Sequence, residues 1–263
     1  MKAPEISTLG IIYAFASLGV SLLILTYFKI NLRKDAIITF LRMTVQLLLV
    51  GFYLEALFTF NNPILNIGYI VVMITAADYT ILRNSGFTMA LFFYTFPAYL
   101  ISIAAVLSYY IVVVFSPPDI FDARFIIPIS GMLLGNSMTR TVVTLDRFYD
   151  SIRKDSETYL SYLSMGATQR EAMRPFFRQA YKAGMAPALA TYSAIGLVSL
   201  PGMMTGQILG GSDPMTAVKY QIVIIMAIFA ATEISTLLAL FLSLRKGFDK
   251  NGFLNRGIFR RRI

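Results

Sequence analysis

The sequence contains no cysteine, no histidine and no tryptophan in 263 residues. Without cysteine, the chain has no disulfide framework, no cysteine-ligated zinc and no iron–sulfur cluster. Without histidine, it lacks the commonest transition-metal ligand and the usual general base near neutral pH. Charge is also scarce, because charged residues make up 14% of the chain, against roughly 25% in an average soluble domain. These absences argue against a soluble globular enzyme.

Apolar residues are abundant instead, at 57% of the chain with a mean hydropathy of +0.67. Seven apolar segments reach or approach the roughly 20 residues that a helix needs to cross a bilayer. The fifth is the weakest, because Arg140 and Asp146 follow it closely. We therefore predict an all-α integral membrane protein with seven transmembrane helices in a multi-pass arrangement. The segments are residues 6–28, 36–60, 64–82, 87–115, 125–138, 184–209 and 215–244.

The distribution of basic residues predicts the orientation of these segments. With the N-terminus outside and the C-terminus inside, 19 of the 23 Lys and Arg lie on the inner side. The basic C-terminal tail then faces anionic lipid in the cell (plasma or inner) membrane, and we expect no nucleic-acid partner. A signal-peptide interpretation of the first segment fits poorly, because its apolar run is too long.

The longest inner connection, residues 139–183, is expected to form a cytoplasmic helical loop. Asp146 and Arg147 begin its charged, amphipathic part, and Gly166 and Ala167 interrupt it. Thr168 can then cap the next helix with Glu171 three residues later, as in a capping box. The spacing leaves two interpretations open, namely a solvated basic face near the lipid headgroups or a docking element for a cytoplasmic partner.

The sixth apolar segment contains residues that break or loosen a helix. One interpretation is a discontinuous helix that lines a translocation pathway, and the other is close packing of helices through small residues. Two neighbouring methionines would suit a soft metal, although methionine is also ordinary packing material. The candidate pathway residues are Pro201, Gly202, Met203, Met204, Thr205, Gly206 and Gln207.

Ionisable groups inside membrane spans are costly and usually face a cavity or a partner. Glu233 lies near the middle of the last segment and is the best candidate for contact with a metal cation, because hard cations prefer oxygen ligands. Gln207 and Gln221 are possible neighbours along the pathway. Arg42 and Asp78 both lie toward the inner side of their segments, which predicts an ion pair between them.

One set of short motifs carries a family resemblance, namely Gly131–Met138, Leu145–Arg147, Met165–Thr168, Gly196–Leu209, Asp213–Pro214 and Tyr220–Val223. Through these motifs most of the chain, and its second half above all, resembles the iron-export permease family of ABC transporters. This family was long catalogued as uncharacterised membrane proteins and includes plant aluminium-tolerance relatives. The resemblance implies that residues 1–263 form one transmembrane permease domain, in which residues 139–183 are the coupling loop.

The resemblance also implies a dimer that pairs with a separate ATP-binding subunit and exports a metal ion by alternating access. The chain has no nucleotide-binding loop, since Gly206 to Gly211 lacks the Lys and Ser/Thr of that motif. We therefore expect no catalytic residue and no cofactor in this chain, with ATP and Mg²⁺ held by the partner. Gly166 and its neighbours also resemble the cytoplasmic loop by which ABC permeases contact their ATPases.

Three other functions are alternatives for a membrane protein of this composition. A secondary transporter driven by an ion gradient remains the main alternative, although no convincing inverted repeat is visible. A retinal protein would need a mid-membrane lysine in an aromatic pocket, whereas Lys219 lies near one end of its segment. A membrane scaffold that anchors a soluble ATPase would carry out no transport at all.

Overall fold

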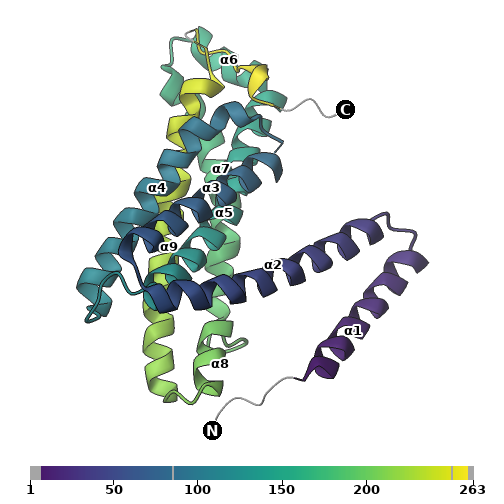
Figure 1. Cartoon of the computed structure of the whole chain (residues 1–263). Helices are drawn as coiled ribbons and strands as arrows, with labels where there is room; N and C mark the ends of the chain where they lie inside the picture. The colour runs from purple at the N-terminus through teal and green to yellow at the C-terminus, as the bar shows by residue number, and fades with distance from the viewer. Residues whose placement is uncertain (1–6, 85, 250, 260–263) are drawn as a thin grey trace.

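The computed structural model describes residues 7–84, 86–249 and 251–259 (Figure 1). Within these ranges the chain is all-helical, with isolated bridge pairs in place of strands. The α-helices are α1 (Thr8–Tyr27), α2 (Arg33–Phe60), α3 (Pro63–Asn84), α4 (Phe92–Tyr109), α5 (Ala123–Lys154), α6 (Ser156–Ser164), α7 (Gln169–Ala194), α8 (Gly202–Leu209) and α9 (Pro214–Gly247). Shorter helical pieces are η1 (Met89–Leu91), η2 (Tyr110–Phe115) and η3 (Arg256–Ile258).

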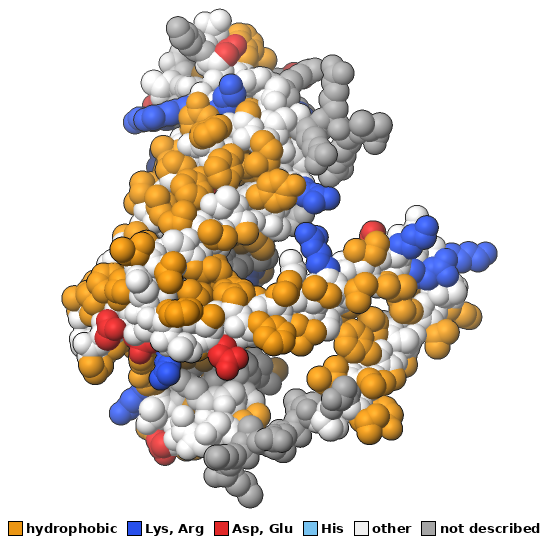
Figure 2. All heavy atoms as spheres, in the orientation of Figure 1, with side chains coloured by type: hydrophobic (Ala, Val, Ile, Leu, Met, Phe, Trp, Pro, Cys, Tyr) orange, Lys and Arg blue, Asp and Glu red, His pale blue; other side chains and the backbone are white. Residues whose placement is uncertain are grey.

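Helices α3, α4, α5, α7 and α9 pack into one bundle, with α9 against α4, α5 and α8. The α8 helix and its turn into α9 lie at one end of this bundle, and α6 lies at the other (Figure 1). We call these the α8 end and the α6 end. Figure 2 shows hydrophobic side chains over the middle of the bundle and charged ones mostly toward its ends, as expected for a protein surrounded by lipid.

Helices α1 and α2 project sideways from the bundle (Figure 1), and we call them the α1–α2 arm. No residue of α2 is buried. Only the last turns of α2 reach the bundle, where Leu54, Leu57 and Phe58 pack against its core. The ring of Tyr53 also meets that of Tyr69 on α3 at 4.9 Å between centroids.

Five of the described helical segments are long and apolar enough to cross a membrane, namely Leu9–Tyr27, Arg33–Phe60, Pro63–Arg83, Met89–Phe115 and Pro214–Gly247. They correspond to the first four predicted spans and the last. The predicted fifth and sixth spans are not among them, so the count of seven and the N-out, C-in orientation stay predictions.

Helix α5 continues unbroken from Ala123 to Lys154, so no helix ends at residue 139 and the start of the cytoplasmic loop there stays a prediction. No glycine or proline lies between residues 139 and 154 to stop α5. At about 48 Å, this helix is longer than the roughly 30 Å of a hydrocarbon core. The expected loop is therefore the end of α5, all of α6 and the first half of α7.

The α6 end is closed by an aromatic cluster that we define as Phe87, Tyr149, Phe248 and Phe259. The Tyr149 ring lies 5.5 Å from Phe87, 6.2 Å from Phe248 and 6.3 Å from Phe259 between centroids. Its hydroxyl pairs with that of Ser243 on α9 at 2.8 Å. Burial raises the pKa of Tyr149, so the phenol stays neutral. Phe248 and Phe259, which follow α9, thereby pack with Tyr149 of α5 and with Phe87 of the segment after α3.

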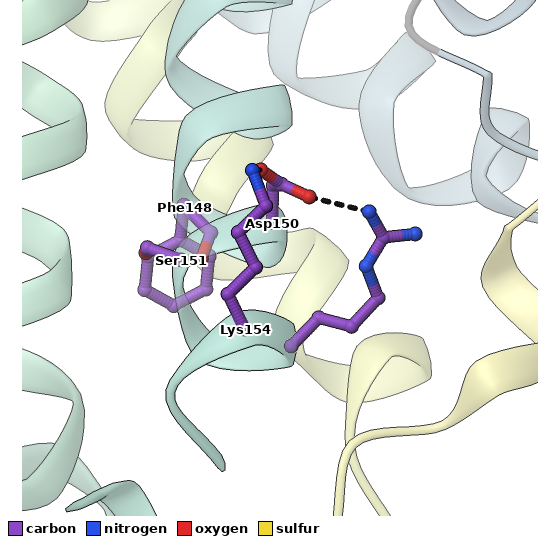
Figure 3. A network of polar contacts seen from close by, with 5 residues as sticks. Phe148, Asp150, Ser151 and Lys154 are labelled. Atoms are coloured by element: carbon purple, nitrogen blue, oxygen red, sulfur yellow. Dashed lines mark hydrogen bonds and ion pairs between the residues drawn. The ribbon is translucent and has the colours of Figure 1, made fainter.

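The last turn of α5 also carries the polar network of Figure 3. Asp150 accepts hydrogen bonds from Lys154, at 2.7 Å, and from Arg153. The hydrogen bond from Lys154, followed by that from Arg153, lowers the pKa of Asp150. Because both basic side chains are exposed, these ion pairs contribute little to stability. They do balance part of the charge on this face of α5.

Candidate transport site and docking elbow

The break predicted in the sixth apolar segment is present, and it begins earlier than Pro201. Helix α7 ends at Ala194, residues 195–201 are non-helical, and Pro201 is the N-cap residue of α8. Gly196 makes the turn with φ of +85°, and its N–H donates to the Ser199 carbonyl at 3.0 Å. Pro187 lies inside α7 without interrupting it.

The non-helical segment 195–201 is poorly covered by the described chain. The side chains of Leu197 and Val198 are 90% and 83% exposed, and Leu200 is also exposed. Non-helical backbone at membrane depth is tolerated only where protein buries it or where it lines a wet cavity. The segment therefore needs either a partner surface or water on its open side.

The structure gathers the predicted pathway residues from Pro201 to Gln207 onto one short helix beside α9. Met203 packs against the bundle core, and the Thr205 hydroxyl donates to the Pro201 carbonyl at 3.2 Å. The carboxamide oxygens of Gln207 and of Gln221 on α9 are buried and have no hydrogen-bond partner within the described residues. Both amides are thus available to a ligand or to water. The set that shares α8 is Pro201, Gly202, Met203, Met204, Thr205, Gly206 and Gln207.

Glu233 lies apart from this group. It is half-buried on α9, twelve residues beyond Gln221, which is about 18 Å along a helix. A single ion cannot contact both side chains at that separation. Within the described residues, no three acidic side chains come close enough together to hold a metal ion. A metal contact at Glu233 therefore remains a prediction that rests on one carboxylate.

The pair expected between Arg42 and Asp78 is not formed in this structure. Asp78 on α3 is fully buried, and one of its carboxylate oxygens accepts from the Thr95 hydroxyl on α4 at 3.0 Å. The other oxygen has no partner within the described residues. Arg42 is exposed on the arm, since only the last turns of α2 approach the bundle.

A row of hydroxyl pairs between α5 and α9 was not anticipated from the sequence. Ser137 lies 3.3 Å from Thr232, and Thr141 lies 2.9 Å from Thr236, between side-chain oxygens. Both partners advance by four residues, so the two helices run parallel. Hydrogen bonds of this kind join helices inside membranes. The matching four-residue spacing of hydroxyl residues in both segments was the available signal.

The predicted docking element is a tight elbow between α6 and α7, which we define as residues 165–168. Gly166 adopts φ of +89°, where a side chain would be strained, and its N–H donates to the Leu163 carbonyl at 3.0 Å. The Ala167 N–H donates to the Tyr162 carbonyl at 3.0 Å. Met165 is 73% exposed at the tip. The elbow therefore presents an apolar side chain on a fixed backbone.

The capping box at the start of α7 is confirmed. The Glu171 carboxylate accepts from the Thr168 backbone N–H at 2.8 Å and from its hydroxyl at 2.7 Å. The Thr168 hydroxyl oxygen in turn accepts from the Glu171 N–H at 3.4 Å. The hydroxyl of Thr168 and then its backbone N–H lower the pKa of Glu171. The carboxylate stays ionised at neutral pH and holds the elbow in register.

The other two predicted coupling residues, Asp146 and Arg147, are exposed on α5. Arg147 lines a surface cavity of about 290 Å³ with Gln179 of α7. Gln179 lies eleven residues from Thr168, which is about 16 Å along the helix. The predicted coupling residues thus form two separate groups, one at the elbow and one midway along the α5–α7 contact.

Comparisons with known proteins identify the family and relatives of this chain. Residues 7–248 match the model of an uncharacterised protein family, UPF0014. The chain is 32% identical over 212 residues to the UPF0014 membrane protein YjkA of Bacillus subtilis, covering 79% of this chain and 82% of that one. It is 28% identical over 249 residues to the probable iron export permease protein FetB of Escherichia coli, covering 95% of each.

A plant relative extends the comparison. The chain is 31% identical over 257 residues to the protein ALUMINUM SENSITIVE 3 of Arabidopsis thaliana, covering 95% of this chain and 92% of that one. No solved structure matches the chain. The relatives and the apolar helices together show a multi-pass membrane protein.

Proposed function

Because the chain belongs to the UPF0014 family of membrane proteins, we propose that it is the permease subunit of an ATP-driven metal exporter. In this proposal two copies of the permease span the membrane, and a separate ATP-binding subunit docks at the elbow. ATP and Mg²⁺ are held by that subunit, and this chain supplies the pathway. The alternative is a secondary transporter that couples the same pathway to an ion gradient.

The observation that carries the proposal is the continuity of α7. This helix of 26 residues, about 39 Å long, begins at the elbow and ends at the non-helical segment 195–201. Its middle is pressed against α5, because a Cβ atom on Gly184 would collide with the Thr144 hydroxyl and meet the Arg140 carbonyl at 3.1 Å. A displacement of the elbow is therefore transmitted to the break in the membrane.

The elbow suits a docking role because it is both exposed and fixed. Its backbone is closed by hydrogen bonds on both sides of Gly166, and the capping box sets the start of α7. Helix α6 is anchored by Tyr159, whose buried hydroxyl donates to the Gly252 carbonyl at 2.8 Å. A force applied at Met165 is thus passed into the bundle, as alternating access requires.

The proposed cargo is a metal ion. The name of the Escherichia coli relative refers to iron export and that of the Arabidopsis relative to aluminium, and Fe³⁺ and Al³⁺ are hard cations that oxygen ligands suit. The pathway offers the Gln207 and Gln221 amides and, farther along α9, the Glu233 carboxylate. Weak, separated oxygen ligands suit passage better than storage, because a transported ion must also leave.

The test is a purification from source membranes in mild detergent, followed by reconstitution into vesicles. We expect a stoichiometric partner that hydrolyses ATP, and uptake of iron into inside-out vesicles that requires ATP. Met165→Asp should release the partner, because it places a charge on the apolar tip of the elbow. Met215→Asp, an equally exposed methionine at the α8 end, should retain it and serves as the matched control.

The opposite results separate the alternatives. A preparation without any ATPase, in which an ion gradient alone drives uptake, would establish the secondary transporter. Binding of the ATPase without uptake of any cation tested would leave a membrane scaffold. Loss of the partner in both methionine variants would remove the elbow as the docking site.

A further inference from the structure

We propose that the α1–α2 arm docks onto a second copy of this chain and covers the non-helical segment 195–201 of that copy. Arg42 and Gln46 of one copy then lie against the segment 195–201 of the other. The inference deepens the dimeric permease of the proposed function and rests on it only for the existence of two copies. It assigns the arm a role that its contacts within one chain do not explain.

The first argument is surface area. The chain exposes 17025 Å², whereas a compact monomer of 29.4 kDa exposes roughly 11,500 Å². The excess is larger than the ~800 Å² that each partner buries in a standard protein interface, so it leaves room for a second copy as well as for lipid. The first 20 residues of α2 and all of α1 extend from the bundle (Figure 1), and no residue of α2 is buried.

The second argument is the polarity of the arm. Lipid can cover its apolar side chains, but Arg42 and Gln46 lie in the first half of α2, inside the predicted span 36–60, and are exposed along one groove with Val45. A charged side chain in hydrocarbon is costly and almost always faces protein or water. The exposed apolar surface of the arm is therefore compatible with lipid, whereas this groove requires a polar partner.

The third argument is that the segment 195–201 lacks a protein surface that covers it. Its backbone is not helical and its Leu197 and Val198 side chains are almost fully exposed. It follows directly the C-terminal end of α7, whose last carbonyls carry partial negative charge. A guanidinium offers five N–H donors and no acceptor. The Ala194 carbonyl already accepts from the Val198 N–H at 3.0 Å, and Arg42 adds further donors and a positive charge at this helix end.

The fourth argument excludes the arm's own bundle as the occupant. The base of the arm is fixed by Asn61, the C-cap residue of α2, whose side-chain oxygen accepts from the Ala123 N–H at 2.9 Å. Its amide nitrogen donates to Asp119 at 3.4 Å. Asn66 adds a hydrogen bond to the Phe121 carbonyl at 3.0 Å. Folding the arm back would break these contacts.

The reach of the arm fits a neighbour. From Arg33 to Phe52 the free part of α2 spans about 30 Å. This length approaches the roughly 30 Å of a hydrocarbon core, so the free part of α2 can lie beside a helix of an adjacent bundle over most of the membrane. By two-fold symmetry, the second copy extends its arm in the same way, and both segments 195–201 are covered at once.

The absence of cysteine from the chain makes a disulfide test direct. One copy carries Val45→Cys on the arm, a second copy with a different tag carries Val198→Cys, and the two are co-expressed and oxidised in the membrane. We expect a disulfide between the two tags. Val72→Cys, on an equally exposed valine of α3, replaces the arm variant as the control and should give none.

A second measurement addresses the chemistry. Arg42→Leu should lower the yield of the cross-chain disulfide severalfold, whereas Lys34→Leu, at the exposed start of α2, should leave it unchanged. Equal yields in these two variants would overturn the role of Arg42.

Three results would overturn the docking itself. A disulfide that forms only within a chain carrying both cysteines would place the arm on its own bundle. A Val198–Val198 cysteine cross-link without any arm cross-link would show a dimer with a different interface. A sample that stays monomeric would remove the second copy, and the ATPase content of the same sample tells separately whether the proposed function also fails.

Discussion

The α6 end of the bundle buries its aromatic side chains within the chain, whereas the α1–α2 arm exposes its own. At the α6 end, Tyr149 is fully buried and touches four other rings. On the arm, Phe52 is 75% exposed. Both regions are helical and both are rich in aromatic residues, so composition does not distinguish them. The difference is that the rings of the α6 end are buried by residues of the same chain, whereas the exposed rings of the arm need lipid or another protein surface to cover them.

This contrast separates two tasks of the proposed transporter. The α6 end must transmit a displacement, which requires a packed and rigid body. The arm must bind something beyond its own bundle, which requires an unsatisfied surface. Helix α7 connects the two requirements, because it starts at the rigid end and stops at the segment that the arm is proposed to cover.

The largest expected effect comes from truncating one aromatic side chain in each region. Tyr149→Ala removes a buried ring and should cost about 3–5 kcal/mol of stability, visible as a lower melting temperature of the purified protein in detergent. Phe52→Ala should cost much less, and any loss should grow on dilution because it reflects association. Equal losses that do not depend on concentration would show that the arm is folded within the single chain.

The second prediction compares an acidic residue of the bundle with one of the arm. Glu233→Gln removes the carboxylate of the proposed pathway while keeping its shape, so metal transport should fall on the order of tenfold with the ATPase still bound. Glu55→Gln, on the exposed face of α2, should transport normally. The measurement is ATP-dependent uptake into vesicles. Unchanged transport in Glu233→Gln would remove this residue from the pathway.

The third prediction concerns the hydroxyl pair between α5 and α9. Thr141→Val and Thr236→Val should each destabilise the protein, because the remaining hydroxyl is left buried. The double variant should recover part of the loss, giving a coupling energy of about 0.6 kcal/mol. Thr44→Val on the arm, whose hydroxyl donates only to its own helix at the Phe40 carbonyl, is the control. A coupling energy of zero would mean that the pair does not join the helices.

The sequence predicted the all-α membrane class, the break before α8 and the capping box at Thr168. These features depend on local composition and on short spacings that act within one helix. It did not predict how far α5 extends, because the charges after Met138 indicate where a helix leaves the lipid and not where the helix stops.

The failure of the Arg42–Asp78 pair has a different cause. Both residues suit an ion pair by depth in their segments, but pairing depends on which helices touch. The sequence carries no signal that only the last turns of α2 touch the bundle, because the apolar surface of this helix would suit lipid or protein equally. Asp78 instead accepts from Thr95, a partner that only the packing of α3 against α4 reveals.

The smallest expected effect is a pH dependence confined to the elbow. Hydrogen bonds from Thr168 lower the pKa of Glu171, so the capping box is fully formed above the ordinary glutamate pKa. Its contribution is lost as the pH falls through the lowered value, and nothing changes near neutral pH. Hydrogen-exchange protection at the Thr168 and Glu171 amides should therefore drop in acid, while protection along α9 stays constant. Glu171→Gln should abolish this pH dependence, because the amide does not titrate. A drop that persists in this variant would assign the acid sensitivity to another group.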